Sequence, residues 1–300
     1  MNANVISYVV SALFLGSNWY ATRICLQGYK PMTAAALRFT LASLVFVVVL
    51  LMGMVKSKPT KSEFRWLALS GVLNAVQYTL FYFALQSISG GLAAVIYGTV
   101  QLFVALVSII ARTEKIKPIQ IAGGLISAAG LAFIYWDRLN LSDSQAKGVV
   151  LMLAAVLVSA VSTVIIKVKG RGVSPILTTA IFLGMSAILI GIGAGIKEGS
   201  AFHFPESYKP TLALAYLGFI GSAAGFGVYF AMMKRVTVMT ASSIAFVLPI
   251  VALTIDWIAN EPLRMTGNAY FGVALTLAGV VLPFVYNLRA ARAQPPPVKA

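Results

Sequence analysis

The chain has 300 residues, of which 59% are hydrophobic and only 10% are charged, with a formal net charge of +15. A soluble globular chain carries about 25% charged residues, so there are too few charges here to cover a water-facing surface. This excludes a soluble enzyme, a disordered chain and a secreted scaffold held by disulfides, the last also because Cys25 is the single cysteine. The composition indicates a protein that crosses the membrane several times.

A helix needs about 20 mainly apolar residues to cross a bilayer. Ten such runs follow one another, at residues 5–27, 32–54, 65–87, 92–111, 117–136, 147–167, 174–196, 210–233, 240–259 and 266–287. Backbone groups in lipid must be bonded within the segment, and these runs do not alternate like barrel strands. The sequence predicts an all-α polytopic membrane protein with ten transmembrane helices. We expect the first run to be a retained span rather than a cleaved signal.

Lysines and arginines are concentrated in alternate loops and in the C-terminal tail, whereas the opposite loops are nearly neutral. By the positive-inside rule, the loops rich in Lys and Arg lie in the cytoplasm. We therefore expect both termini to be cytoplasmic, in a multi-pass protein of the cytoplasmic (inner) membrane. The positive charge is a topology signal, and we expect no nucleic-acid partner.

The two halves of the chain resemble each other. At an offset of 147 residues, Tyr82-Phe83-Ala84 aligns with Tyr229-Phe230-Ala231, and Glu114 with Glu261. This predicts one five-helix repeat over 1–136, a second over 147–287, and a cytoplasmic tail over 288–300. Because five is odd, the second repeat enters the membrane from the opposite side. Inverted repeats place a substrate site near the midplane and support alternating access.

Four short motifs follow one another along the chain. They are Gly16-Ser17-Asn18-Trp19, Ala36-Leu37-Arg38-Phe39, Thr99-Val100-Gln101-Leu102-Phe103, and Val247-Leu248-Pro249-Ile250 followed by Asn260-Glu261-Pro262-Leu263. Together they resemble the drug/metabolite transporter superfamily, specifically its EamA-type ten-helix transporters. The resemblance implies a transporter, in a family that includes exporters of amino acids and other metabolites. Gln101 stands where the family usually has proline.

Polar and aromatic side chains share one face of several predicted spans, spaced three or four residues apart. We expect these faces to meet in an aromatic-walled cavity, which would suit an amphipathic or aromatic metabolite; the alternative is simple hydrogen bonding and packing between helices. The candidate substrate-binding residues are Asn18, Trp19, Thr22, Arg38, Asn74, Gln77, Tyr78, Tyr82, Tyr97, Gln101, Ser162, Tyr229 and Phe246.

We expect specific roles for Arg38 and for three further residues outside this set. Arg38 lies inside the second span, where a charge costs about 2.5–3.5 kcal/mol on insertion scales, so it either bonds neighbouring backbone or anchors a substrate carboxylate in bidentate fashion. Glu114 and Glu261 stand where spans leave the membrane, and we expect a structural or gating role for them; the alternative is direct coupling of transport. Pro249 removes a helix hydrogen bond and gives either a gating bend or a static kink.

Small residues predict close packing between helices. Gly123 and Gly130 in the fifth span and Gly279 in the tenth form such faces, and Gly184, Gly191 and Gly195 would give the seventh span a similar face.

The sequence offers no enzyme chemistry, cofactor or metal site. The single histidine, His203, has no second ligand beside it, no Ser/His/Asp triad can form, and no ATP-binding module is present. No acidic residue lies at a span centre, so we do not expect organic-cation antiport, and facilitated export suffices physically.

The sequence therefore predicts a secondary transporter of small metabolites that works by alternating access, most plausibly exporting amino acids or aromatic and amphipathic compounds. The alternatives are a transporter of neutral metabolites such as nucleosides or vitamins, and a non-transporting membrane partner protein. Import and proton coupling stay open. The expected partners are a small-molecule substrate and the lipid bilayer, with the chain as a monomer.

Overall fold

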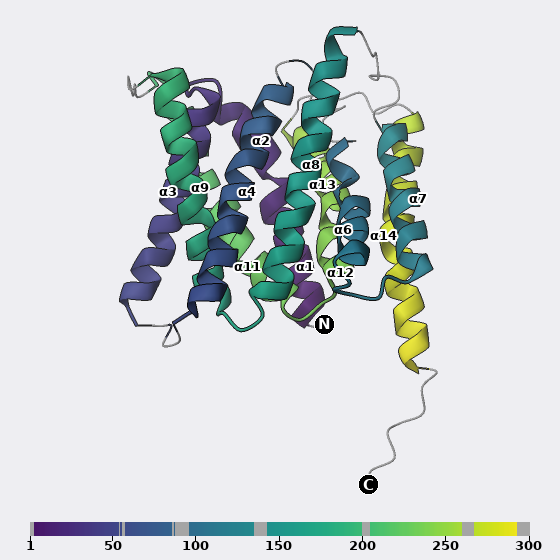
Figure 1. The fold of residues 1–300 in the computed structure, drawn as a ribbon. Helices are drawn as coiled ribbons and strands as arrows, with labels where there is room; N and C mark the ends of the chain where they lie inside the picture. Colours follow the sequence, from purple (N-terminus) through teal and green to yellow (C-terminus); the bar gives the residue numbers. More distant parts are fainter. Residues whose placement is uncertain are drawn as a thin grey trace.

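The computed structural model describes residues 3–53, 55, 58–85, 87, 96–134, 143–199, 205–259 and 267–292, which form a helical bundle with no strand among them (Figure 1). The helices are α1 (Ala3–Gly16), α2 (Asn18–Cys25), α3 (Pro31–Leu51), α4 (Lys61–Leu85), α6 (Val100–Ile110), α7 (Pro118–Ile134), α8 (Asp143–Lys169), α9 (Pro175–Glu198), α10 (Tyr208–Tyr216), the π-helix η2 (Leu217–Ala224), α11 (Gly225–Met233), α12 (Val238–Ser242), α13 (Ile244–Ile258) and α14 (Gly267–Arg292).

Each of the ten predicted spans is helical in its described part. Four of them consist of several helical pieces: α1 and α2 form the first, residues 96–98 and α6 the described part of the fourth, α10, η2 and α11 the eighth, and α12 and α13 the ninth. Within the described ranges, five helical stretches are long and apolar enough to cross a membrane by themselves, and shorter apolar helices include Ile96–Ile110 and Pro118–Phe133. Helix α14 continues to Arg292, so helix extends beyond residue 288, where the tail was expected to begin.

The packing of the helices repeats when the two halves of the chain are exchanged. Helix α4 packs against α8 and α9, and the corresponding segment α10–η2–α11 packs against α1, α2 and α3. In the same way α6 contacts α8, and α13 contacts α1. Helix α3 packs against its counterpart α9, and α7 against its counterpart α14. This confirms the all-α fold, with the inverted arrangement that places equivalent helices around a common centre.

Three spans are interrupted, each at a serine or threonine whose hydroxyl donates to the carbonyl three residues earlier. The pairs are Ser17–Phe14 at 2.9 Å, Thr99–Ile96 at 2.6 Å and Ser243–Thr240 at 2.8 Å. Such hydroxyl-to-backbone bonds compete with the helical ladder and bend helices. Together with η2, a π-helix of the kind often found at functional sites, these interruptions lie in the spans that surround the centre of the bundle.

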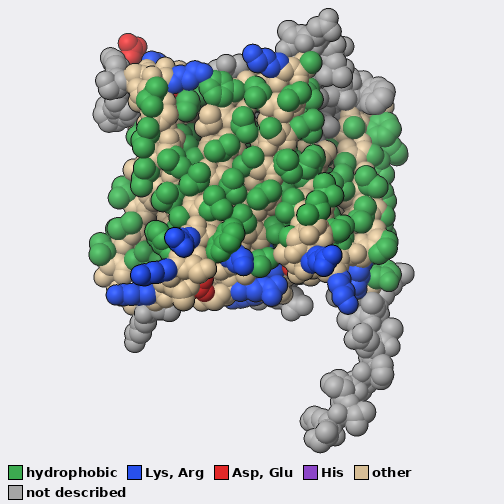
Figure 2. Space-filling model, in the orientation of Figure 1, with side chains coloured by type: hydrophobic (Ala, Val, Ile, Leu, Met, Phe, Trp, Pro, Cys, Tyr) green, Lys and Arg blue, Asp and Glu red, His purple; other side chains and the backbone are tan. Residues whose placement is uncertain are grey.

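The surface has an apolar middle and charged edges. Figure 2 shows hydrophobic side chains covering the height of the bundle and Lys and Arg gathered at its two ends, most of them at the lower end. The most exposed apolar side chains include Leu51, Ile110 and Ile196, at 72% or more exposure. Such a surface fits lipid, because a membrane protein exposes apolar side chains to acyl chains. Helix α1 begins and α14 ends at the lower end (Figure 1).

Close packing by small residues occurs between α7 and α14. A Cβ atom on Gly123 or Gly279 would lie 2.5 Å from the carbonyl oxygen of the other glycine, and Ser127 donates to the Thr276 carbonyl at 3.0 Å. The similar face predicted for the seventh span is wrong. Added Cβ atoms there would meet nothing within 4 Å, because those glycines point away from the neighbouring helices; they are Gly184, Gly191 and Gly195.

Candidate functional site

A cavity of about 690 Å³ lies at the centre of the bundle, between the two halves of the chain. Both halves supply its walls, from α1, α2, α3, α4 and α6 on one side and from α8, α9, α11, α12 and α13 on the other. Eleven of the thirteen candidate substrate-binding residues line it: Asn18, Trp19, Thr22, Arg38, Asn74, Gln77, Tyr78, Tyr82, Tyr97, Ser162 and Tyr229. The faces inferred from helical spacing therefore converge on one space.

The two ends of the cavity differ in exposure. Arg23 and Leu26, at the end of α2, line one end, where Arg23 is exposed. Ile166 and Phe230 line the other end and are 6% and 3% exposed. Among the described residues, the cavity thus extends toward the bundle end where α2 terminates and stops among buried side chains at the opposite end.

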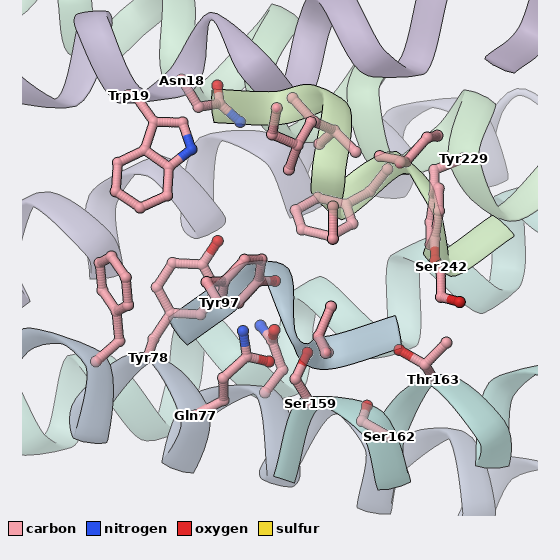
Figure 3. Close-up of a pocket in the computed structure, with 18 of the residues that line it drawn as sticks. Asn18, Trp19, Gln77, Tyr78, Tyr97, Ser159, Ser162, Thr163, Tyr229 and Ser242 are labelled. Atoms are coloured by element: carbon pink, nitrogen blue, oxygen red, sulfur yellow. The ribbon is translucent and has the colours of Figure 1, made fainter. Parts of the chain in front are cut away.

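Aromatic rings form much of the wall. Tyr78 stands edge-on to Phe39 with ring centroids 4.9 Å apart, and Trp19 stands edge-on to Phe81 at 5.7 Å. Such pairs add about 0.5–1.5 kcal/mol each beyond the area they bury. Figure 3 shows Trp19, Tyr78 and Tyr97 facing the same space. The wall is therefore well ordered by ring packing and offers ring faces and edges to a ligand.

Two serine hydroxyls line the side of the cavity formed by α8 and α12, and both donate their protons to backbone carbonyls. Ser162 donates to the Ser70 carbonyl at 3.1 Å, and Ser242 donates to the Met239 carbonyl at 3.2 Å. Their remaining lone pairs can accept hydrogen bonds. In Figure 3, Ser162 lies with Ser159 and Thr163 opposite Asn18 and Trp19. This side of the cavity can thus receive a donor group of a ligand.

Two of the predicted amide side chains, Asn74 and Asn18, form hydrogen bonds between helices. Asn74 donates to Ser186 at 2.9 Å, which in turn donates to the Gly71 carbonyl at 3.0 Å. Asn18 donates to the Gly221 carbonyl of η2 at 3.1 Å. These bonds tie α4 to α9 and α2 to η2, so each amide joins neighbouring helices while a part of it borders the cavity.

Arg38 reaches the cavity wall from α3 and is 4% exposed. Its Nε donates to Ser222 Oγ at 3.0 Å. Its guanidinium carbon lies 5.1 Å from the Phe39 ring centre and 5.8 Å from the Tyr78 ring centre. Cation–π contacts of this kind stabilise a desolvated guanidinium. Arg38 therefore bonds a neighbouring span and lines the cavity as well.

Gln101 and Phe246 lie outside the cavity. Gln101 is 4% exposed with Oε1 unpartnered, and Phe246 is fully buried against Leu131 and Val280. Tyr97 and Ser242 line the cavity, but on each span the cavity face continues through the residues three and seven positions further on. These are Val100 and Val104 after Tyr97, and Ala245 and Pro249 after Ser242. The residues four positions on, Gln101 and Phe246, fall beyond the edge of that face.

Three residues were expected to serve structure or gating, and the structure describes two of them. Glu114 accepts hydrogen bonds from the Val238 amide at 3.0 and 3.2 Å, at the start of α12. A carboxylate there satisfies a free helix N–H and opposes the helix dipole. Pro249 lies inside α13 and lines the cavity. Glu261 lies outside the described residues.

Sequence reasoning missed two features. Glu198 caps α3, accepting from the Met32 and Thr33 amides at 2.8 Å each and from the Thr33 hydroxyl at 2.7 Å, although in sequence it resembles any loop acid. Phe182 lines the cavity from α9, a span whose apolar residues give no periodic signal. Among the described residues, no cluster of His, Cys, Asp or Glu could hold a metal ion.

An inverted bundle of apolar helices around a central cavity of this size is the architecture of a secondary transporter. The model of the family described as "EamA-like transporter family" matches residues 3–136 and 146–285. The chain belongs to the EamA-like transporter family, as its motifs indicated, and this family points to a membrane transporter.

Three proteins similar to this chain over most of its length illustrate the relationship. Protein PagO of Salmonella typhimurium is 24% identical over 95% of this chain and 96% of its own length. The uncharacterized transporter YoaV of Bacillus subtilis is 22% identical over 92% of this chain and 95% of its own. A "Probable amino-acid metabolite efflux pump" of Escherichia coli is 22% identical over 91% and 92%. A protein crystal structure with 19% identity superposes with a TM-score of 0.81 over 96% of this chain and 98% of that one, which supports the fold.

Proposed function

We propose that this protein exports small metabolites, amino acids or other aromatic and amphipathic compounds, from the cytoplasm by alternating access. The observation that carries the proposal is the central cavity, whose walls come from both halves and combine aromatic rings with amides and hydroxyls. A volume of about 690 Å³ falls within the range of small-molecule sites, about 300–1,000 Å³. The efflux role in the name of the Escherichia coli relative points in the same direction.

In this proposal the repeats over 1–136 and 147–287 are the halves that rearrange around the cavity, and the basic end of the bundle faces the cytoplasm. The end where α2 terminates then faces outward. The cavity extends toward that end and is closed at the other by buried side chains. The structure would correspond to an outward-facing state, from which an exporter releases its substrate.

The experiment is uptake by proteoliposomes of an isotope-labelled pool of amino acids and other metabolites, read by mass spectrometry with and without a pH gradient. We expect selective uptake of aromatic or amphipathic amino acids without a gradient. Tyr78→Ala, Tyr82→Ala and Tyr97→Ala should each lower transport more than they lower the folded yield. Tyr270→Ala is the matched control, since Tyr270 lies on α14 with 64% exposure, outside the cavity. Unaltered transport in all three cavity variants would contradict the proposal.

A neutral substrate, such as a nucleoside or vitamin, is the second candidate, because hydroxyls and amides outnumber charges in the cavity wall. A neutral substrate should still be transported when Arg38 loses its charge, whereas a substrate with a carboxylate should not.

A further inference from the structure

The Arg38 guanidinium has bonding capacity that the protein leaves unused. Only Nε has a hydrogen-bond partner among the described residues, Ser222 at 3.0 Å, and Nη2 is buried without one. The side chain is 4% exposed and lines the cavity. A guanidinium presents five N–H donors and keeps its proton at any physiological pH. Since a buried donor without an acceptor is unfavourable, such a group calls for a partner from the cavity side.

The described walls of the cavity supply no negative charge to pair with this cation. The only other charged residue that lines the cavity in the described part of the chain is Arg23, which is also basic. The acids whose contacts are described are engaged at helix ends: Glu63 with Thr60, Glu114 with Val238, and Glu198 with Met32 and Thr33. An isolated buried cation is unfavourable unless it is paired. The missing anion therefore has to come with a ligand.

The surroundings of Arg38 define the rest of that ligand. Tyr78 lies next to the guanidinium and continues into the aromatic wall with Tyr82, ring centroids 6.3 Å apart. A planar carboxylate is the anion that a guanidinium binds through two parallel hydrogen bonds. An aromatic or apolar body attached to it would lie along the tyrosine rings. The described walls offer an ammonium group no carboxylate.

We propose that Arg38 is the specificity-determining residue of the cavity, and that it selects substrates with a carboxylate on an aromatic or apolar body, whether or not they carry an amine. This inference rests on the proposed function, because it takes the central cavity as the substrate site. It goes beyond that function by assigning the recognition to charge at Arg38, so that aryl carboxylates without an amine become substrates of the same site.

Binding to the purified full-length protein tests the inference without transport. The ligands are 3-phenylpropionate, its neutral amide, phenethylamine and phenylalanine, titrated while thermal unfolding and tryptophan fluorescence are followed. We expect 3-phenylpropionate and phenylalanine to bind with similar affinity, and the amide and the amine at least about tenfold more weakly, as the loss of one charge-assisted bond implies. Tighter binding of the amine than of the carboxylate would overturn the inference.

Two variants separate recognition from folding. Arg38→Gln should weaken 3-phenylpropionate at least about tenfold and leave the amide unchanged, and unchanged amide binding shows that the cavity is intact. Ser222→Ala removes the partner of Nε but keeps the charge, and should retain the preference for carboxylate over amide. If Arg38→Gln does not fold, Arg38→Lys serves: it should keep that preference with lower affinity, because ammonium lacks the bidentate geometry. Loss of the preference in Arg38→Lys, or its persistence in Arg38→Gln, would overturn the inference.

A small inorganic anion is the other source of negative charge. Titration with sodium chloride, with and without 3-phenylpropionate, distinguishes the two. If chloride alone raises the melting temperature and 3-phenylpropionate adds nothing, the site binds inorganic anions and the inference is wrong. Proteoliposome flux then separates this inference from the proposed function. Carboxylates that bind through Arg38 but are not transported would contradict the transport proposal only, whereas flux of amino acids that ignores Arg38→Gln would contradict the inference only.

Discussion

Lys167 and Lys234 each donate hydrogen bonds to backbone carbonyls at or just beyond the end of the helix that carries the other lysine. Lys167, near the end of α8, donates to the carbonyls of Met233 and Val236, and Lys234, directly after α11, donates to those of Arg171 and Val173. Carbonyls at helix ends lack helical partners, and a cation there also opposes the helix dipole. The two lysines thus hold the ends of α8 and α11 together at the closed end of the cavity.

From this relationship we expect Lys167→Met with Lys234→Met to loosen the closed end. Hydrogen bonds to charged groups contribute about 1.5–3 kcal/mol each, so the melting temperature should fall. Access is measured with Ser242→Cys, a cavity position, after the buried Cys25 is replaced by alanine. A membrane-impermeant maleimide should label it from the cytoplasmic side only in the lysine variant.

Lys169→Met is the control for this change. Lys169 lies on the same helix but is exposed and contacts the Trp66 ring at 5.3 Å. It should alter neither the melting temperature nor the side of labelling. Equal labelling in wild type and in the double lysine variant would show that these bonds do not hold the cavity closed.

Replacement of Glu198 should destabilise the protein more than replacement of an ordinary surface acid. Glu198→Ala leaves the first amides of α3, at Met32 and Thr33, without their acceptor, which we expect to cost about 1–3 kcal/mol. Glu198→Gln keeps one acceptor oxygen and should lie between Ala and wild type. Glu206→Ala, at an exposed position, should be nearly neutral. Thermal unfolding in detergent ranks the three, and equal melting temperatures would contradict the cap.

The contact between α7 and α14 makes a graded prediction for glycines. Gly279→Ala places a methyl group 2.5 Å from the Gly123 carbonyl oxygen and 2.3 Å from Ser127 Oγ, so the helices must separate, at a typical overpacking cost of about 1–3 kcal/mol. Gly191→Ala meets nothing within 4 Å and should stabilise its helix by up to about 1 kcal/mol, because alanine is the better helix former. Opposite shifts in melting temperature are expected, and shifts of the same sign would contradict the packing.

The interruption at Thr99 should matter for transport. Thr99→Val removes the hydroxyl that donates to the Ile96 carbonyl at 2.6 Å, so we expect the turn around Thr99 to change and Tyr97 to shift within the cavity wall. Transport should fall several-fold with little change in stability. Thr79→Val is the matched control, because Thr79 donates to the Ala75 carbonyl at 2.9 Å inside the uninterrupted α4. Equal transport rates in the two variants would show that the interruption is not needed.

Much of the site followed from helical spacing wherever the helix is regular. Asn74, Gln77, Tyr78 and Tyr82 lie on α4, which is uninterrupted, and all four line the cavity. The same reasoning failed for Gln101 and Phe246, because the cavity face continues from Tyr97 and Ser242 through Val100 and Ala245, three residues on, rather than four. Helical spacing leaves a choice between the residues three and four positions on, and the packing of the neighbouring helices decides which of them faces the cavity.

The sequence by itself determined that the protein lies in a membrane, and it determined the fold class and the family. Long apolar runs can only be helices in lipid, since no water is there to satisfy a free backbone, and a repeat with an odd number of spans has to be inverted. The tertiary structure alone decided which polar groups are engaged. Only contacts between segments far apart in the chain show that Glu198 caps α3 and that Lys167 and Lys234 donate to carbonyls near each other's helix end. The same holds for Arg38, which bonds Ser222 with one nitrogen and has another nitrogen without a partner.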